Sequence, residues 1–160
     1  MVPLEHQCRE RWDRVKIEEG ILLVKSSLAK QRVGPYQIQA AISAIHAESL
    51  SWLETDWPQI YALYSLLHQL TPSPVIKINQ AIACSYAHSP EKALICIESI
   101  LETDEVERYQ PYFLAKSDIL YRCGRLQEAI SLLKKGIELC ANQSNRLFLE
   151  RKLAQLKSAL

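Results

Sequence analysis

A short repeated segment constrains the fold of this chain more than any other feature of its sequence. The pattern of residues 91–95, Glu-Lys-Ala-Leu-Ile, returns at residues 127–131 as Gln-Glu-Ala-Ile-Ser, so Ala93 and Ala129 occupy equivalent positions. Each copy opens an amphipathic helical pattern that follows another one. The two alanines are 36 positions apart (129 − 93). Helical repeats with a period of about this length cannot bury their apolar faces alone and become stable only by stacking on neighbouring units. The chain is therefore expected to be a scaffold of stacked helix pairs.

The composition agrees with an all-helical chain. Of the 160 residues, 48% are hydrophobic and only four are glycines, while apolar residues recur at helical spacing instead of alternating. A period of about 34 residues in helix–turn–helix units is typical of tetratricopeptide repeats (TPRs). We expect an all-α, right-handed α-α superhelix of TPR-like helix pairs with a terminal capping helix. An irregular helical bundle is the alternative.

Proline, glycine and capping residues divide the chain into units. Helices are expected to end near residues 31, 48, 70, 87, 102, 123, 140 and 159, with Asp56 and Ser89 capping two starts and Gly124 suited to a left-handed end. Residues 1–33 are interpreted as a linker and a first packing helix. Three degenerate TPR-like repeats follow at about 34–72, 73–108 and 109–142, and the capping helix spans 144–160.

Charge and hydropathy exclude several classes of partner. With 19 basic and 18 acidic residues the net charge is +1, which leaves no global field to hold a nucleic acid. The longest apolar run, Ile21–Val24, is far shorter than a membrane span. Met1 is not followed by a basic and then apolar signal region. The expectation is a cytoplasmic protein without a membrane or direct nucleic-acid partner.

No motif for catalysis, a metal or a cofactor is present in the sequence. The four histidines lack a second ligand at helical metal-site spacing, and there is no phosphate-binding glycine loop or nucleophile elbow. The five cysteines are interpreted as small buried hydrophobic residues in a reducing compartment. The acidic residues Glu102, Asp104, Glu105 and Glu107 are interpreted as a solvated loop, not a cation site. A non-enzyme without cofactor or metal is expected.

The inward face of such an array is the candidate site for a protein partner. It is lined by the first helix of each pair, and it is apolar over much of its length in the expected register. The candidate residues are Gln37, Ile78, Ile82, Tyr86, Asp118, Tyr121 and Arg122. The alternative is that curvature or the first helix already covers this face. Trp52 and Trp57 either anchor a partner or, as we favour, pack between units.

An ordered series of motifs resembles one protein family. The series contains Gly34-Pro35-Tyr36-Gln37-Ile38-Gln39-Ala40-Ala41-Ile42, then Thr55-Asp56-Trp57 and Thr71-Pro72-Ser73-Pro74. Before it stand Leu4-Glu5-His6-Gln7-Cys8-Arg9 and Arg11-Trp12-Asp13-Arg14, where the family usually has acids at the positions of His6 and Cys8. The chain resembles the C-terminal TPR-like extension of extracytoplasmic-function (ECF) RNA polymerase sigma factors over nearly its whole length.

The resemblance implies a regulatory module. In that family the promoter-reading and polymerase-binding regions lie upstream of this domain, and no basic recognition helix is found here. The implied partners are the sigma core regions or RNA polymerase, and the implied role is to tune transcription initiation. The chain is then either a domain of a longer sigma factor or a stand-alone remnant. The alternative function is a stand-alone TPR adaptor that binds a peptide or protein unrelated to transcription.

Overall fold

The computed structural model describes residues 3–30, 33–101 and 103–158, and these parts are helical without any strand. Two short 3₁₀ turns, Leu4–His6 and Arg9–Arg11, precede the first α-helix. The helices are α1 (Arg14–Leu28), α2 (Pro35–Glu48), α3 (Trp57–Leu70), α4 (Pro74–Ala87), α5 (Pro90–Glu98), α6 (Asp104–Glu107), α7 (Gln110–Arg122), α8 (Leu126–Glu138) and α9 (Gln143–Ser158). The expected all-α class is confirmed.

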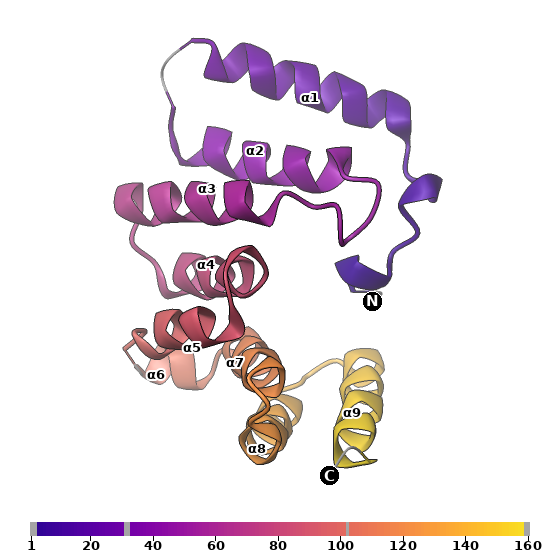
Figure 1. Cartoon of the computed structure of the whole chain (residues 1–160), viewed down its shortest axis with the longest axis vertical. Helices are drawn as coiled ribbons and strands as arrows, with labels where there is room; N and C mark the ends of the chain where they lie inside the picture. Colours follow the sequence, from indigo (N-terminus) through magenta and orange to yellow (C-terminus); the bar gives the residue numbers. More distant parts are fainter. Residues whose placement is uncertain (1–2, 31–32, 102, 159–160) are drawn as a thin grey trace.

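The helices stack in chain order along the long axis of the molecule, from α1 at one end to α7, α8 and α9 at the other (Figure 1). Each long helix packs against the next one in the chain, and α4 also contacts α7. One cluster of buried side chains joins α2, α3 and α4, a larger one joins α4, α5 and α7, and a third joins α8 and α9. The apolar core therefore follows the stack from α2 to α9.

The helix starts follow from capping chemistry. Asp56 accepts a hydrogen bond from the Gln59 backbone N–H at 3.0 Å, and Ser89 accepts one from Lys92 at 3.3 Å. A proline, which has no backbone N–H to satisfy, follows in the first turn of each helix, at Pro58 and Pro90. Helix α7 ends before Gly124, whose φ of 75° lies in the left-handed region that glycine tolerates. The sequence-based caps are confirmed.

Two predicted helix ends lie three or more residues from those of the structure, and one predicted loop contains a helical turn. Helix α1 ends at Leu28 instead of near 31, and α5 ends at Glu98 instead of near 102, while residues 31 and 102 lie outside the described part of the chain. The acidic connection is not only a loop: α6 forms one helical turn, capped by the Thr103 side chain. Val106 explains the turn, because it is 1% exposed and anchors the segment on the core.

Small residues let α7 and α8 approach closely. Ala93 and Ala129, the two equivalent positions of the repeat, are both 0% exposed. Across from Ala129, the Ser117 hydroxyl donates to the Ala129 carbonyl at 2.7 Å. Gly136 lies against Leu114 so closely that a Cβ built on it would stand 2.8 Å from a methyl carbon. Ala129 thus marks a close crossing of α7 and α8, as the sequence predicts, and Ala93 is buried at the equivalent position of the repeat.

Candidate protein-binding surface

The N-terminal segment, residues 3–12, is anchored to the end of α2 by Arg9. This side chain is only 3% exposed and donates to the carbonyls of His46 and Ser49 at 2.9 and 3.0 Å. It also donates to the Thr55 hydroxyl at 3.3 Å. The last carbonyls of a helix lack intrahelical donors, so an arginine placed there satisfies groups that would otherwise need water. Sequence reasoning assigned Arg9 no role beyond its place in the family-like motif.

An aromatic cluster fills the space between the α2–α3 connection and α4. Trp57 stacks on Tyr86 with ring centroids 4.5 Å apart, and Trp52 meets both rings edge-on. Trp57 is 7% exposed, so the interpretation of the tryptophans as packing residues is confirmed. His46 also belongs to the cluster, and burial, with a smaller contribution from Arg9, lowers its pKa.

Tyr86 and Arg122 connect α4 to α7 through this cluster. The central guanidinium carbon of Arg122 lies 4.0 Å from the centroid of the Tyr86 ring, and the same side chain donates to the Ser85 hydroxyl. A cation over an aromatic face is attracted by the ring quadrupole. Stacking and this hydrogen bond together hold Arg122 in one orientation.

Two acidic groups affect the pKa of the Tyr86 phenol. Burial raises the pKa of the Tyr86 phenol, the Asp118 carboxylate raises it further, and Arg122 acts in the opposite direction. Glu5 of the N-terminal segment also raises it, and the same residue lines a groove with Leu114 and Ser117 of α7. Asp118 in turn accepts a hydrogen bond from the Lys152 ammonium of α9 at 3.0 Å. The structure therefore brings together Tyr86, Asp118 and Arg122. Tyr121, which is also one of the predicted residues, is the chain neighbour of Arg122. We call these four residues the α4–α7 face.

Tyr121 is the most accessible aromatic residue of this face. Its side chain is 46% exposed, and it follows Leu114 by seven positions, which places both on the same side of α7. An exposed tyrosine beside a fixed arginine is a combination typical of interface anchors.

Three of the predicted surface residues are placed elsewhere. Ile78 is 2% exposed in the core, and Ile82 packs partly buried against the same core cluster. For Ile78 the prediction of an exposed stripe is wrong, because α4 is covered by α3, α5 and α7 and must bury more than one of its sides. Ile82 keeps part of its surface exposed. Gln37 uses its side-chain oxygen to accept the Gly34 backbone N–H at 3.1 Å and lines a groove between α1 and α2, away from Tyr86.

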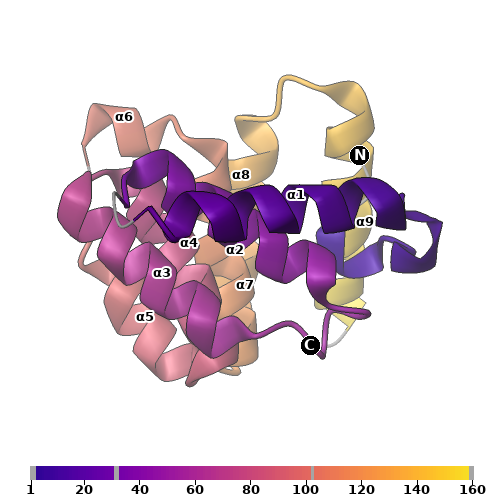
Figure 2. The same ribbon diagram turned by 90° about the horizontal axis from the view of Figure 1, so that it is seen from above.

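A groove opens between the N-terminal segment, α7, α8 and α9, and we call it the α7–α9 groove. Its volume is about 460 Å³. Leu114, Leu133 and Leu149 form its apolar floor, and Glu5 and His6 line the N-terminal wall. Helix α9 contributes Phe148, Arg151, Lys152 and Gln155. The N-terminal segment lies beside α9 in both ribbon views (Figures 1 and 2).

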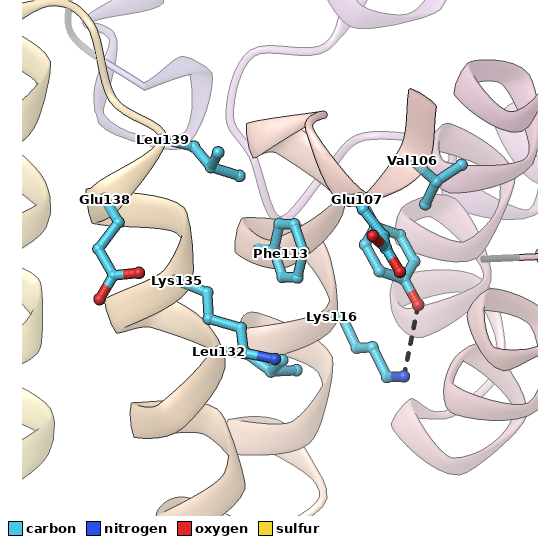
Figure 3. A pocket seen from close by; sticks show the side chains of 9 residues that line it. Val106, Glu107, Phe113, Lys116, Leu132, Lys135, Glu138 and Leu139 are labelled. Atoms are coloured by element: carbon cyan, nitrogen blue, oxygen red, sulfur yellow. Dashed lines mark hydrogen bonds between the residues drawn. The ribbon is translucent and has the colours of Figure 1, made fainter. Parts of the chain in front are cut away.

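A second pocket of about 400 Å³ lies between α6, α7 and α8 (Figure 3). Phe113 lies in the middle of this view, with Leu132 and Leu139 toward α8. Two lysines and two glutamates surround these apolar groups: Glu107, Lys116, Lys135 and Glu138. The Lys116 ammonium donates to the Tyr112 hydroxyl at 3.4 Å. The charges of this rim cancel, so the pocket has no excess charge that would select one ligand.

The remaining reactive side chains are dispersed. Within the described residues no group of three or more potential metal ligands is found. The five cysteines are free, and Cys84 and Cys140 are buried while Cys8 is exposed, against the expectation for that residue. Burial raises the pKa of the Cys84, Cys96 and Cys123 thiols, which keeps them protonated near neutral pH. Among the described helices, none is both long and apolar enough to cross a bilayer.

Comparison with known proteins identifies a relative that is much longer than this chain. No family model matches the chain, and no solved structure matches it. Over 156 residues, or 98% of its length, the chain is 36% identical to an uncharacterized protein of Rhizobium meliloti (strain 1021). The chain spans only 36% of the length of that curated relative. The similar protein therefore contains a region like this chain within a much longer polypeptide.

Proposed function

We propose that this chain is a non-catalytic, regulatory protein–protein interaction domain of an ECF-type RNA polymerase sigma factor, and that it tunes transcription initiation. Its architecture in this proposal is a right-handed superhelix of three TPR-like pairs, α2–α3, α4–α5 and α7–α8, with α9 as the cap. The repeat around Ala93 and Ala129, the chain-order stacking and the close α7–α8 crossing support it. So does α9, which buries Leu149 and Leu156 and leaves most of its other side chains toward solvent.

The observation that carries the proposal is the fixed Tyr86–Arg122 pair next to the exposed Tyr121. Interfaces draw most of their affinity from a few aromatic and arginine side chains, particularly where these are already ordered before binding. Arg122 is ordered by the Tyr86 ring and the Ser85 hydroxyl. A partner that contacts this face would lose little side-chain entropy there, which favours a protein-binding role.

The anchored N-terminal segment supports the connection to a sigma factor. In the family that the chain resembles, the segment equivalent to residues 4–14 leads in from the promoter-reading regions. Here Arg9 fixes this segment to α2, and Glu5 lines a groove together with Ser117 of α7. Regions joined to it would be held next to the α4–α7 face and not on a free tether. In the proposal, those regions are the partner.

The length of the Rhizobium meliloti relative is compatible with this arrangement, because most of that protein lies outside the matched region. The proposal is tested by titrating the chain with the purified promoter- and polymerase-binding regions of an ECF sigma factor of the type it resembles. Saturable binding that depends on Tyr121 and Arg122 is expected. An adaptor unrelated to transcription would show no binding to the sigma regions.

A further inference from the structure

Helix α9 presents one side to the α7–α9 groove. Phe148, Arg151, Lys152 and Gln155 follow the i, i+3, i+4, i+7 spacing that aligns side chains on one side of a helix. This wall therefore combines one aromatic ring, two cations and one amide. Phe148 is 38% exposed, although apolar floor residues lie next to it. The ring is available to a partner that brings its own apolar side chain.

The charges of the groove differ between its two walls. On the α9 wall, Lys152 is paired with Asp118, whereas Arg151 belongs to no ion pair within the described residues. On the N-terminal wall, Glu5 lies 3.4 Å from the His6 imidazole. Helix α9 as a whole carries Arg146, Arg151, Lys152 and Lys157 against Glu150, although the net charge of the chain is only +1. The basic excess is thus concentrated on the helix that borders the groove.

We propose that the α7–α9 groove binds an extended acidic peptide segment of a partner protein, with an apolar side chain against Phe148 and a carboxylate on Arg151. An arginine fork binds a carboxylate in a bidentate fashion, and apolar area around it strengthens the pair by excluding water. Pro3 and the 3₁₀ turn Leu4–His6 form the wall opposite α9, so a peptide in the groove would lie between this turn and α9. This inference rests on the proposed protein-binding role, but it does not depend on the partner being a sigma factor.

The test measures fluorescence anisotropy of a short labelled peptide in which leucines are flanked by glutamates. A matched peptide has lysines in place of the glutamates. The full chain should bind the acidic peptide at least about tenfold more tightly than the lysine peptide, since like charges facing Arg151 are repelled. Equal binding of the two peptides would overturn the proposal.

Variants locate the binding within the groove. Arg151→Glu should weaken binding of the acidic peptide about tenfold. Lys157→Glu makes the same charge change on α9 outside the groove and should change the affinity little. Phe148→Ala should weaken it about fivefold, whereas Leu147→Ala, its exposed neighbour, should not. Glu5→Gln should strengthen binding, because it removes an acid from the opposite wall. All of these positions except Glu5 lie on α9, and circular dichroism checks that its helix is retained.

Two further outcomes would contradict a peptide site in this groove. Equal effects of Arg151→Glu and Lys157→Glu would show general electrostatic attraction to α9. A single-stranded oligonucleotide that binds as tightly as the peptide and also depends on Arg151 would identify a nucleic-acid site instead. If the sigma regions bind but the acidic peptide does not, only the groove proposal fails. If the peptide binds but the sigma regions do not, the function proposed above fails and the groove remains.

Discussion

Arg122 lies over the ring of Tyr86, with 4.0 Å between the guanidinium carbon and the ring centroid, and so joins α7 to the aromatic cluster of α4. The ring is packed on its other sides by Trp52 and Trp57. Tyr86 is therefore part of the core as well as of the α4–α7 face. A substitution of Tyr86 therefore changes both the free energy of unfolding and the candidate binding surface.

Replacing Tyr86 with alanine should lower the free energy of unfolding by about 2 to 3 kcal/mol, because the half-buried ring loses its stacking partners and leaves a cavity. Urea unfolding followed by circular dichroism measures the change. Tyr36→Ala is the control, since that tyrosine is 84% exposed, and its effect should stay within about 0.5 kcal/mol. Equal effects of the two substitutions would contradict the aromatic cluster.

Arg9→Ala should lower the free energy of unfolding by about 1 to 3 kcal/mol, because the partly buried carbonyls of His46 and Ser49 lose their donor. Limited proteolysis should then cut within residues 3–12 much faster than in the unmodified chain. Arg11→Ala removes a nearby exposed arginine instead, and it should leave both properties unchanged. Slow proteolysis of the Arg9 variant would show that other contacts hold the segment.

Ala129→Leu should cost about 1 to 3 kcal/mol, because the added atoms have no space at the α7–α8 crossing. Ala129 is 0% exposed, and its carbonyl accepts the Ser117 hydroxyl at that point. Ser131→Leu places the same side chain on the exposed side of α8 and serves as the control. Thermal melting separates the two variants, and an unchanged melting temperature for Ala129→Leu would mean that the crossing lies elsewhere.

His46 should make the fold less stable in mild acid. Its folded-state pKa lies below its ordinary value of 6.5, chiefly because of burial. As the pH falls through the ordinary value, the unfolded chain binds a proton that the folded chain does not, so stability decreases until the lowered folded-state pKa is reached. The difference in unfolding free energy between about pH 7.5 and about pH 5.5 should be smaller in His46→Gln. An identical pH dependence in the two proteins would show that His46 does not cause the loss of stability.

The sequence predicted those parts of the fold that depend on local chemistry. Helix starts at Pro35, Pro74 and Pro90 and the end before Gly124 follow from capping rules that involve only neighbouring residues. The burial of Ala93 and Ala129 follows from the repeat. The helix boundaries could be predicted because each is decided within a few residues along the chain, and the two buried alanines because the repeat shows them to be equivalent.

Features that depend on distant contacts were not predicted. Ile78 was assigned to an exposed stripe because a helical pattern does not show how many neighbours cover the helix. Arg9 was missed because a buried arginine needs acceptors, and these come from positions about 40 residues away. The turn at α6 was missed because its one apolar anchor, Val106, stands among charged residues that are typical of a loop. The Tyr86–Arg122 contact required the relative placement of α4 and α7.

Binding to the sigma regions tests the proposed function most directly. Isothermal titration of the chain with the purified promoter- and polymerase-binding regions of such a sigma factor should give saturable binding, and Tyr121→Ala should weaken it by about 1 kcal/mol or more with an unchanged circular dichroism spectrum. Tyr36→Ala, an exposed tyrosine on α2, is the matched control and should bind like the unmodified chain. Absence of heat and of any complex with the sigma regions, or full binding by a folded Tyr121→Ala and Arg122→Ala double variant, would contradict the proposed function.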